Sequence, residues 1–144
     1  PRTAGKAASR TPPTAPPLRE ACWRSDGGFN RIYLQIYDEA SRRAATAFAQ
    51  QLKAEVGAWV QVAPLDNVTR SAELRGQRRP VPWAQPTWVA HDTAAHRCAH
   101  ALAQHLGPGE KGAAWVRSLP PALPAQAGVM ELWWPPSGAM AATP

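Results

Sequence analysis

The chain has 144 residues and a formal net charge of +6, with 16 prolines, 10 glycines and 2 cysteines. This length fits one domain with terminal segments. No run of 18 apolar residues is present, so we expect no transmembrane segment. The charge is uneven: residues 1–24 carry five basic residues and one acidic residue. This pattern indicates a basic arm on a nearly neutral core.

Residues 1–28 are rich in Pro, Ala, Thr and Arg, with TPPTAPP near the centre. Such a segment buries too little apolar surface to offset its ordering entropy, so we expect a disordered, Pro-rich basic linker. Cys22 lies in this arm, and Cys98 lies on a predicted helix. A disulfide that pins the arm in an oxidising compartment and two unrelated thiols both remain open.

Residues 31–62 predict a strand, a helix and a second strand. Apolar residues alternate with Tyr33, Gln35 and Tyr37, which is typical of a half-buried strand. Asp38 is placed to cap the helix, and Gly57 to end it. The second strand covers residues 59–62, with Trp59 and Gln61 outward. The buried stripe of the helix is predicted to contain Ser41, Ala44, Ala45, Phe48, Leu52 and Val56.

Residues 66–86 carry the weakest pattern in the core. The segment SAELR fits either a short edge strand or the start of a long loop, and RGQRRPVP is basic and broken by proline. We therefore expect a mobile loop here.

A degenerate copy of the first unit follows. Residues 92–106 match residues 38–52 at a constant offset of 54, with eight of fifteen positions identical. Asp92 is the second predicted helix cap, and AAWVRSL repeats the strand GAWVQVA. We expect a last strand in VMELWW and a disordered tail over residues 135–144. The predicted buried stripe of the second helix is Ala95, Cys98, Ala99, Leu102 and Leu106.

This order predicts an α+β domain over residues 29–134. The expected fold is a ferredoxin-like split βαβ sandwich, βαββαβ plus a C-terminal strand, with two helices on one face of an antiparallel sheet. The other face is then open to solvent or a ligand, unless VMELWW or the tail folds over it. From the strand phases, the residues projecting from it are Tyr33, Gln35, Tyr37, Trp59, Gln61, Val89, His91, Trp115 and Arg117.

Signals for catalysis or metal binding are weak. His96 and His100 have a spacing that can hold a metal, but no HExxH-type glutamate stands between them, so we expect a solvated pair and no metal. Cys98 lies in the predicted buried stripe, which disfavours a nucleophile. The chain has no Gly-rich phosphate loop, GxSxG or CxxC. We therefore expect neither enzyme activity nor a cofactor.

Three segments, IYLQIYDEASRRAATAF, VAPLDNVTRSAELR and ELWW, resemble the LytR C-terminal and SPOR domains of bacterial envelope or multidomain proteins. The resemblance covers residues 32–134. It implies a split βαβ fold that binds peptidoglycan on the exposed sheet, in the periplasm or cell envelope. The ligand-binding positions that it implies are Tyr33, Gln35, Tyr37, Trp59 and Trp115.

The leading hypothesis is a non-catalytic envelope module that binds peptidoglycan glycan or a protein partner through its aromatic sheet face. An RNA-binding module of the same topology is an alternative, because aromatic side chains on such sheets stack bases. It is less favoured, since no RNP1-like motif is present. The third hypothesis is an accessory or oligomerisation domain of a larger protein. The favoured location is the periplasm or cell envelope, and the cytoplasm is the alternative.

Overall fold

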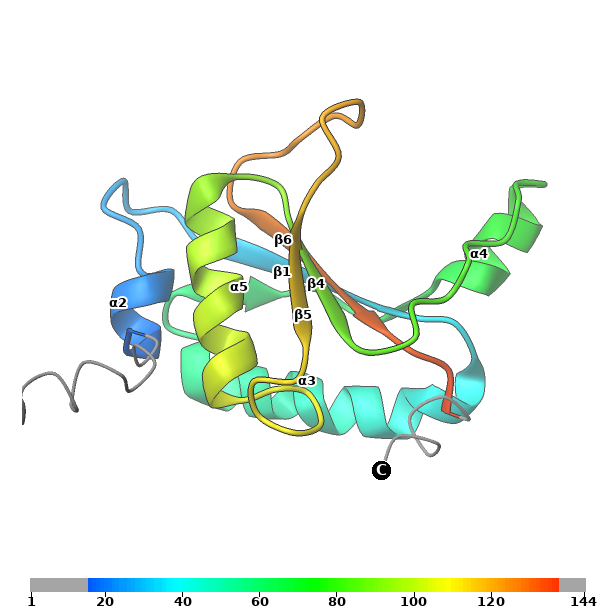
Figure 1. The fold of residues 1–144 in the computed structure, drawn as a ribbon, viewed down its shortest axis with the longest axis horizontal. Helices are drawn as coiled ribbons and strands as arrows, with labels where there is room; N and C mark the ends of the chain where they lie inside the picture. Colours follow the sequence, from blue (N-terminus) through cyan, green and yellow to red (C-terminus); the bar gives the residue numbers. More distant parts are fainter. Residues whose placement is uncertain (1–15, 138–144) are drawn as a thin grey trace, which may run out of the picture.

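The computed structural model describes residues 16–137, and parts of the expected linker and tail (residues 1–15 and 138–144) lie outside them. The domain is a mixed α/β structure (Figure 1). Its elements are α2 (Leu18–Cys22), β1 (Asn30–Ile36), the 3-10 helix η1 (Glu39–Ser41), α3 (Arg42–Val56), β2 (Val60–Val62), β3 (Asp66–Asn67), α4 (Val68–Leu74), β4 (Thr87–Ala90), α5 (Thr93–His105), β5 (Trp115–Ser118) and β6 (Val129–Trp134).

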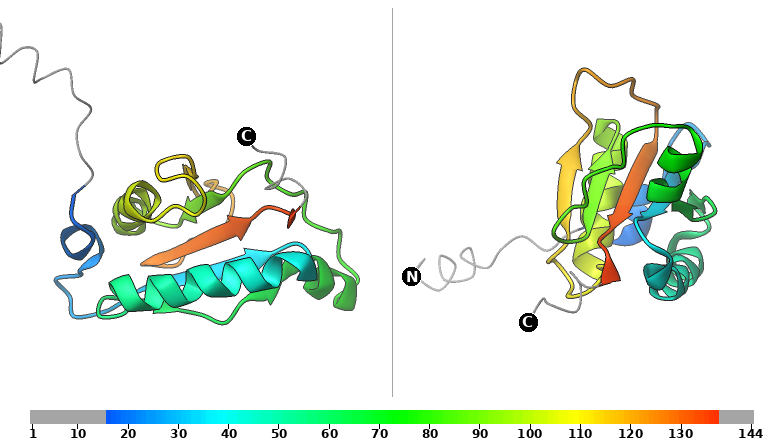
Figure 2. Two further views of the ribbon diagram at one scale, coloured as in Figure 1. Left: turned by 90° about the horizontal axis from the view of Figure 1, so that it is seen from below. Right: turned by 90° about the vertical axis from the view of Figure 1, so that its right-hand side faces the viewer.

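The strand order is β2-β1-β6-β4-β5, with β3 also pairing with β1 (Figure 2, right). β1 runs parallel to β2, β3 and β6, and β4 runs parallel to β5. The β4–β6 pair is antiparallel. The expectation of an antiparallel sheet is therefore wrong, because the sheet is largely parallel. The ferredoxin-like arrangement is not confirmed: β2 lies directly beside β1 and β5 directly beside β4, so neither βαβ unit is split by another strand.

The internal repeat has a structural counterpart. β1-α3-β2 and β4-α5-β5 are two parallel strand pairs, each joined through a helix. Asp92 caps α5 as predicted, because its carboxylate accepts a hydrogen bond from the Ala95 N–H (2.8 Å). Asp38 accepts one from the Ser41 N–H (3.1 Å), but it caps η1; the N-cap of α3 is Ser41, which makes no side-chain cap bond. β6 pairs with β1 on one side and β4 on the other, so it joins the two repeats into one sheet.

Helices α3 and α5 pack over the same sheet face, as expected. Ile32 and Leu34 of β1 pair with Met130 and Leu132 of β6, and all four side chains are fully buried. They share one core cluster with residues of both helices. The helix residues of this cluster are Ala45, Phe48, Ala49, Leu52 and Val56 of α3 and Ala95, Cys98, Ala99, Ala101, Leu102 and Ala103 of α5.

The N-terminal segment differs from the expected linker, because residues 18–22 form α2, which packs beside α5 (Figure 1). A disulfide joins Cys22 to Cys98 of α5. The buried Asn30 amide also donates a hydrogen bond to the Cys22 carbonyl (2.9 Å). Since these contacts anchor the segment to the core, the folded part begins well before residue 29.

The region around residues 66–86 also differs from the expected loop. Its first part forms β3 and α4, and the Asn67 side chain caps α4 by accepting a hydrogen bond from the Arg70 N–H (3.0 Å). α4 and α2 lie at opposite ends of the domain (Figure 1). Within residues 16–137, no helix is long and apolar enough to cross a bilayer.

Candidate functional site

The sheet face opposite α3 and α5, called here the helix-free face, carries two rows of side chains. Each row runs across β1, β6, β4 and β5, and the strand register fixes its members. One row is Tyr33, Glu131, Val89 and Arg117, and the other is Gln35, Trp133, Thr87 and Trp115.

Three of the five predicted ligand residues reach this face with some exposure. Tyr33 and Gln35 are half-buried, and Trp115 is 39% exposed. The Gln35 Oε1 is buried and has no hydrogen-bond partner among the described residues. The role of these side chains in binding stays a prediction.

The other two predicted residues are not exposed on this face. Tyr37 is only 5% exposed, because the segment around Trp83 covers it. Trp59 precedes β2, and its N–H donates a hydrogen bond to the Val56 carbonyl in the turn after α3. Its ring packs against the core cluster, not on the helix-free face. The five predicted residues therefore do not form one continuous surface.

Trp83 contacts two residues of β5, Trp115 and Arg117, and these three side chains are called here the Trp–Arg ladder. The Arg117 guanidinium lies 5.1 Å from the Trp83 ring centroid and 4.9 Å from that of Trp115. The two indoles meet edge to face at 6.4 Å. Such contacts hold the guanidinium and both rings in place. Trp83 lies in a proline-broken segment with no periodicity, so no local pattern marked it as part of a site.

A cavity of about 270 Å³ adjoins the ladder on the same face. Tyr37 and Trp133 form part of its wall, with ring centroids 5.8 Å apart, and Trp83 lines it as well. The Trp83 backbone N–H donates to the Tyr37 hydroxyl oxygen at 3.4 Å. Burial raises the pKa of Tyr37 to about 12, so this side chain is neutral at physiological pH. The remaining lining residues are Pro80, Val81, Val89, Leu119, Pro120, Leu123 and Glu131.

Glu131 is the charged group of this cavity. Its Oε1 accepts a hydrogen bond from the Trp133 indole N–H (2.9 Å), and its Oε2 lies 2.7 Å from the His91 Nε2. The His91 Nδ1 accepts a hydrogen bond from the Gln126 N–H (3.1 Å). Because Nδ1 is an acceptor, the proton of a neutral imidazole is on Nε2 and points at Glu131. In this tautomer, two neutral donors hold the carboxylate.

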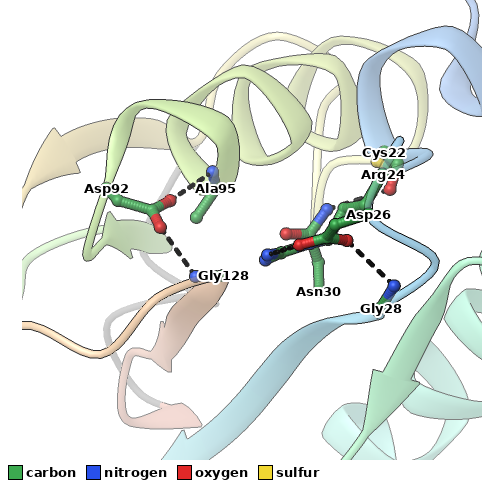
Figure 3. Close-up of polar contacts among 8 residues, drawn as sticks. All are labelled: Cys22, Arg24, Asp26, Gly28, Asn30, Asp92, Ala95 and Gly128. Atoms are coloured by element: carbon green, nitrogen blue, oxygen red, sulfur yellow. Dashed lines mark hydrogen bonds and ion pairs between the residues drawn. The ribbon is translucent and has the colours of Figure 1, made fainter.

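A second polar cluster surrounds the N-terminus of α5 (Figure 3). Beyond capping the helix, Asp92 accepts a hydrogen bond from the Gly128 N–H (2.7 Å), which ties α5 to the start of β6. Arg24 pairs with Asp26 (2.6 Å), and this guanidinium lowers the pKa of Asp26 to about 2. These contacts are within the fold, so we interpret the cluster as a structural junction.

The two histidines of the predicted pair differ in their surroundings. His100 is exposed, and His96 lines a polar cavity of about 400 Å³ beside Asp92. Among the residues that the structure describes, no group of three or more His, Cys, Asp or Glu side chains could hold a metal ion.

No protein-family model, curated protein or solved structure matches this chain. The resemblance to LytR C-terminal and SPOR domains therefore stays a prediction.

Proposed function

We propose that this chain is a non-catalytic binding module that takes a cell-envelope glycan, peptidoglycan, on its helix-free face. The observation that carries the proposal is the Trp–Arg ladder, which presents Trp115 and Arg117 on a sheet surface that no helix covers. Tyr33 and Gln35 continue the same surface across β1.

The exposed rings supply a physical reason for binding. Covering the exposed 39% of Trp115 would remove roughly 100 Å² from water, which contributes about 2 kcal/mol. Flat rings of this kind stack on the apolar faces of sugars. The Arg117 guanidinium offers N–H donors to hydroxyl or carboxylate oxygens of the same ligand.

The disulfide supports the proposed compartment. Disulfides persist in oxidising locations such as the bacterial periplasm and are rare in the cytosol. The Cys22–Cys98 bond therefore favours the periplasm or cell envelope, in line with the location that the family resemblance implies.

The proposal is tested by co-sedimentation with purified peptidoglycan. We expect the unmodified chain to be retained, and the Tyr33→Ala/Trp115→Ala double variant to lose most of this retention. Trp23→Ala is the matched control, because Trp23 is 58% exposed but follows α2 on the helical side of the domain. No retention of the unmodified chain, or equal loss with the control, would contradict the proposal.

One observation favours RNA as a second candidate ligand. Two indoles with a guanidinium beside both of them also suit base stacking and contact with phosphate. An electrophoretic shift at two salt concentrations tests this candidate. Binding that survives deletion of residues 1–15 and fails in Trp115→Ala would support it, whereas a shift that requires only the basic arm would not.

A further inference from the structure

We propose that the cavity between Tyr37, Trp83 and Trp133 binds an alkylated ammonium group, with Glu131 as its counter-charge. The inference goes beyond the proposed function, because unmodified peptidoglycan carries no alkylated ammonium group. The cavity and the Trp–Arg ladder share the helix-free face but take different ligands.

The charge of Glu131 is the first argument. Its side chain is 19% exposed, and among the described residues its one ionisable partner is His91. The neutral His91 tautomer and the Trp133 indole donate hydrogen bonds but supply no positive charge. A partly buried carboxylate without a cation is electrostatically uncompensated, so a cation entering the cavity meets a favourable potential.

The aromatic walls are the second argument. Cations are attracted to the faces of Trp and Tyr rings, and three such side chains line this cavity. Tyr37 presents a neutral phenol, since burial raises its pKa to about 12. Arg117 shows that this part of the face already holds one cation against indole rings, but Arg117 is not among the residues that line the cavity.

The size and lining of the cavity narrow the class of cation. Its volume of about 270 Å³ lies just below the usual range for drug-sized ligands, so it suits a single small group. A primary ammonium needs acceptors for three N–H groups, and the polar side chains of this lining are Tyr37 and Glu131, with the Trp83 and Trp133 indoles as donors only. A quaternary or N-methylated ammonium has few or no N–H groups to satisfy and places its methyl groups against the apolar walls.

Other ligand classes fit less well. An anion would face Glu131 directly, and the indole N–H of Trp133 is already bonded to that carboxylate. A neutral apolar group would remove water from the Glu131 carboxylate without replacing the lost hydration, which is unfavourable.

The experiment uses the ¹⁵N-labelled chain and its indole N–H signals in two-dimensional NMR. The probes are choline, its neutral isostere 3,3-dimethyl-1-butanol and butylammonium. The Trp133 indole is the reporter, because its N–H is bonded to Glu131. We expect saturable shifts of the Trp133 and Trp83 signals with choline. The neutral isostere should bind at least about tenfold more weakly.

Variants locate the site. Glu131→Gln keeps the side-chain shape and removes the charge, so it should weaken choline binding about tenfold. Trp23→Leu is the control, because Trp23 follows α2 and lies outside the cavity lining, and its choline affinity should be unchanged. Equal binding of choline and the neutral isostere to the unmodified chain would overturn the proposal without any variant. Tighter binding of butylammonium than of choline would overturn the preference for an alkylated group.

The two experiments distinguish failure of the ammonium site from failure of the glycan proposal. Choline binding without retention on peptidoglycan would keep the ammonium site and remove the glycan proposal. Retention on peptidoglycan that depends on Tyr33 and Trp115, with no choline response, would keep the glycan proposal and remove the ammonium site.

Discussion

Removing the Cys22–Cys98 disulfide should destabilise the domain strongly. The bond links residues 76 positions apart in the sequence, and closing a loop of this length lowers the entropy of the unfolded chain by an amount worth about 4 kcal/mol. Single domains typically unfold with a free energy of about 5–15 kcal/mol. Loss of the cross-link therefore removes a large share of the stability and should lower the melting temperature by roughly 15 °C.

The assay is urea denaturation of the oxidised and the chemically reduced chain. Reduction leaves both sulfur atoms in place, and both residues are fully buried, so the comparison isolates the covalent link from packing. We also expect a steeper denaturant dependence after reduction, because the reduced unfolded chain exposes more surface. Cys22→Ala/Cys98→Ala should be less stable still, since it also loses buried side-chain atoms.

Equal denaturation midpoints for the oxidised and reduced chains would refute this reasoning. So would a thiol titration of the native oxidised protein that finds two free cysteines. Either result would remove the covalent link as an anchor of residues 16–28 and leave only their packing against α5 and the Asn30–Cys22 hydrogen bond.

Three further changes test other parts of the fold. Gly128→Ala and Gly27→Ala should each cost roughly 1–2 kcal/mol, because both glycines have a positive φ; the atom nearest the added Cβ at Gly128 is the end of the flexible Arg24 side chain, which can move away at little cost. Asp92→Ala should destabilise by about 2 kcal/mol in urea denaturation, since it removes the α5 cap and leaves the Gly128 N–H without its acceptor. Folding raises the pKa of Tyr37 from 10.0 to about 12, so the unfolded chain ionises at a lower pH than the folded one. The free energy of unfolding should therefore be unaffected by this group below pH 10 and fall by about 2 kcal/mol between pH 10 and pH 12. Tyr37→Phe should not show this fall.

The repeated unit could be predicted well, because its signals are local. Asp92 caps α5 as its position indicated, and Asp38 caps the 3-10 helix η1 that precedes α3. The alternation of residues 32–36 correctly separates the buried face from the helix-free face. Period and capping chemistry depend on near neighbours in the sequence, so a single chain is sufficient to identify them.

Strand order could not be predicted in the same way, because it depends on long-range pairing. β6 enters between the two repeats and runs parallel to β1. Burial on both faces is typical of a central strand. In the sequence, the apolar run VMELWW was the one feature that indicated a central position for β6.

The candidate site was only partly predictable. Trp59 was assigned by extending strand alternation one residue too far, since β2 begins at Val60. Tyr37 continues the predicted alternation of β1, but the segment around Trp83 covers its ring. Because the two residues are 46 positions apart, their contact leaves no local pattern in the sequence. The hydrogen bond between Glu131 and His91 likewise depends on the register of β6 against β4, whereas Glu131 and Trp133 lie two residues apart on the same strand.

The most direct test of binding at the helix-free face is NMR mapping with soluble peptidoglycan fragments. Saturable shifts should appear at Tyr33, Trp115 and Arg117 and leave α2 unchanged. Shifts centred on the exposed Trp23 and Phe29, or no shifts at saturating fragment, would contradict a ligand site on that face.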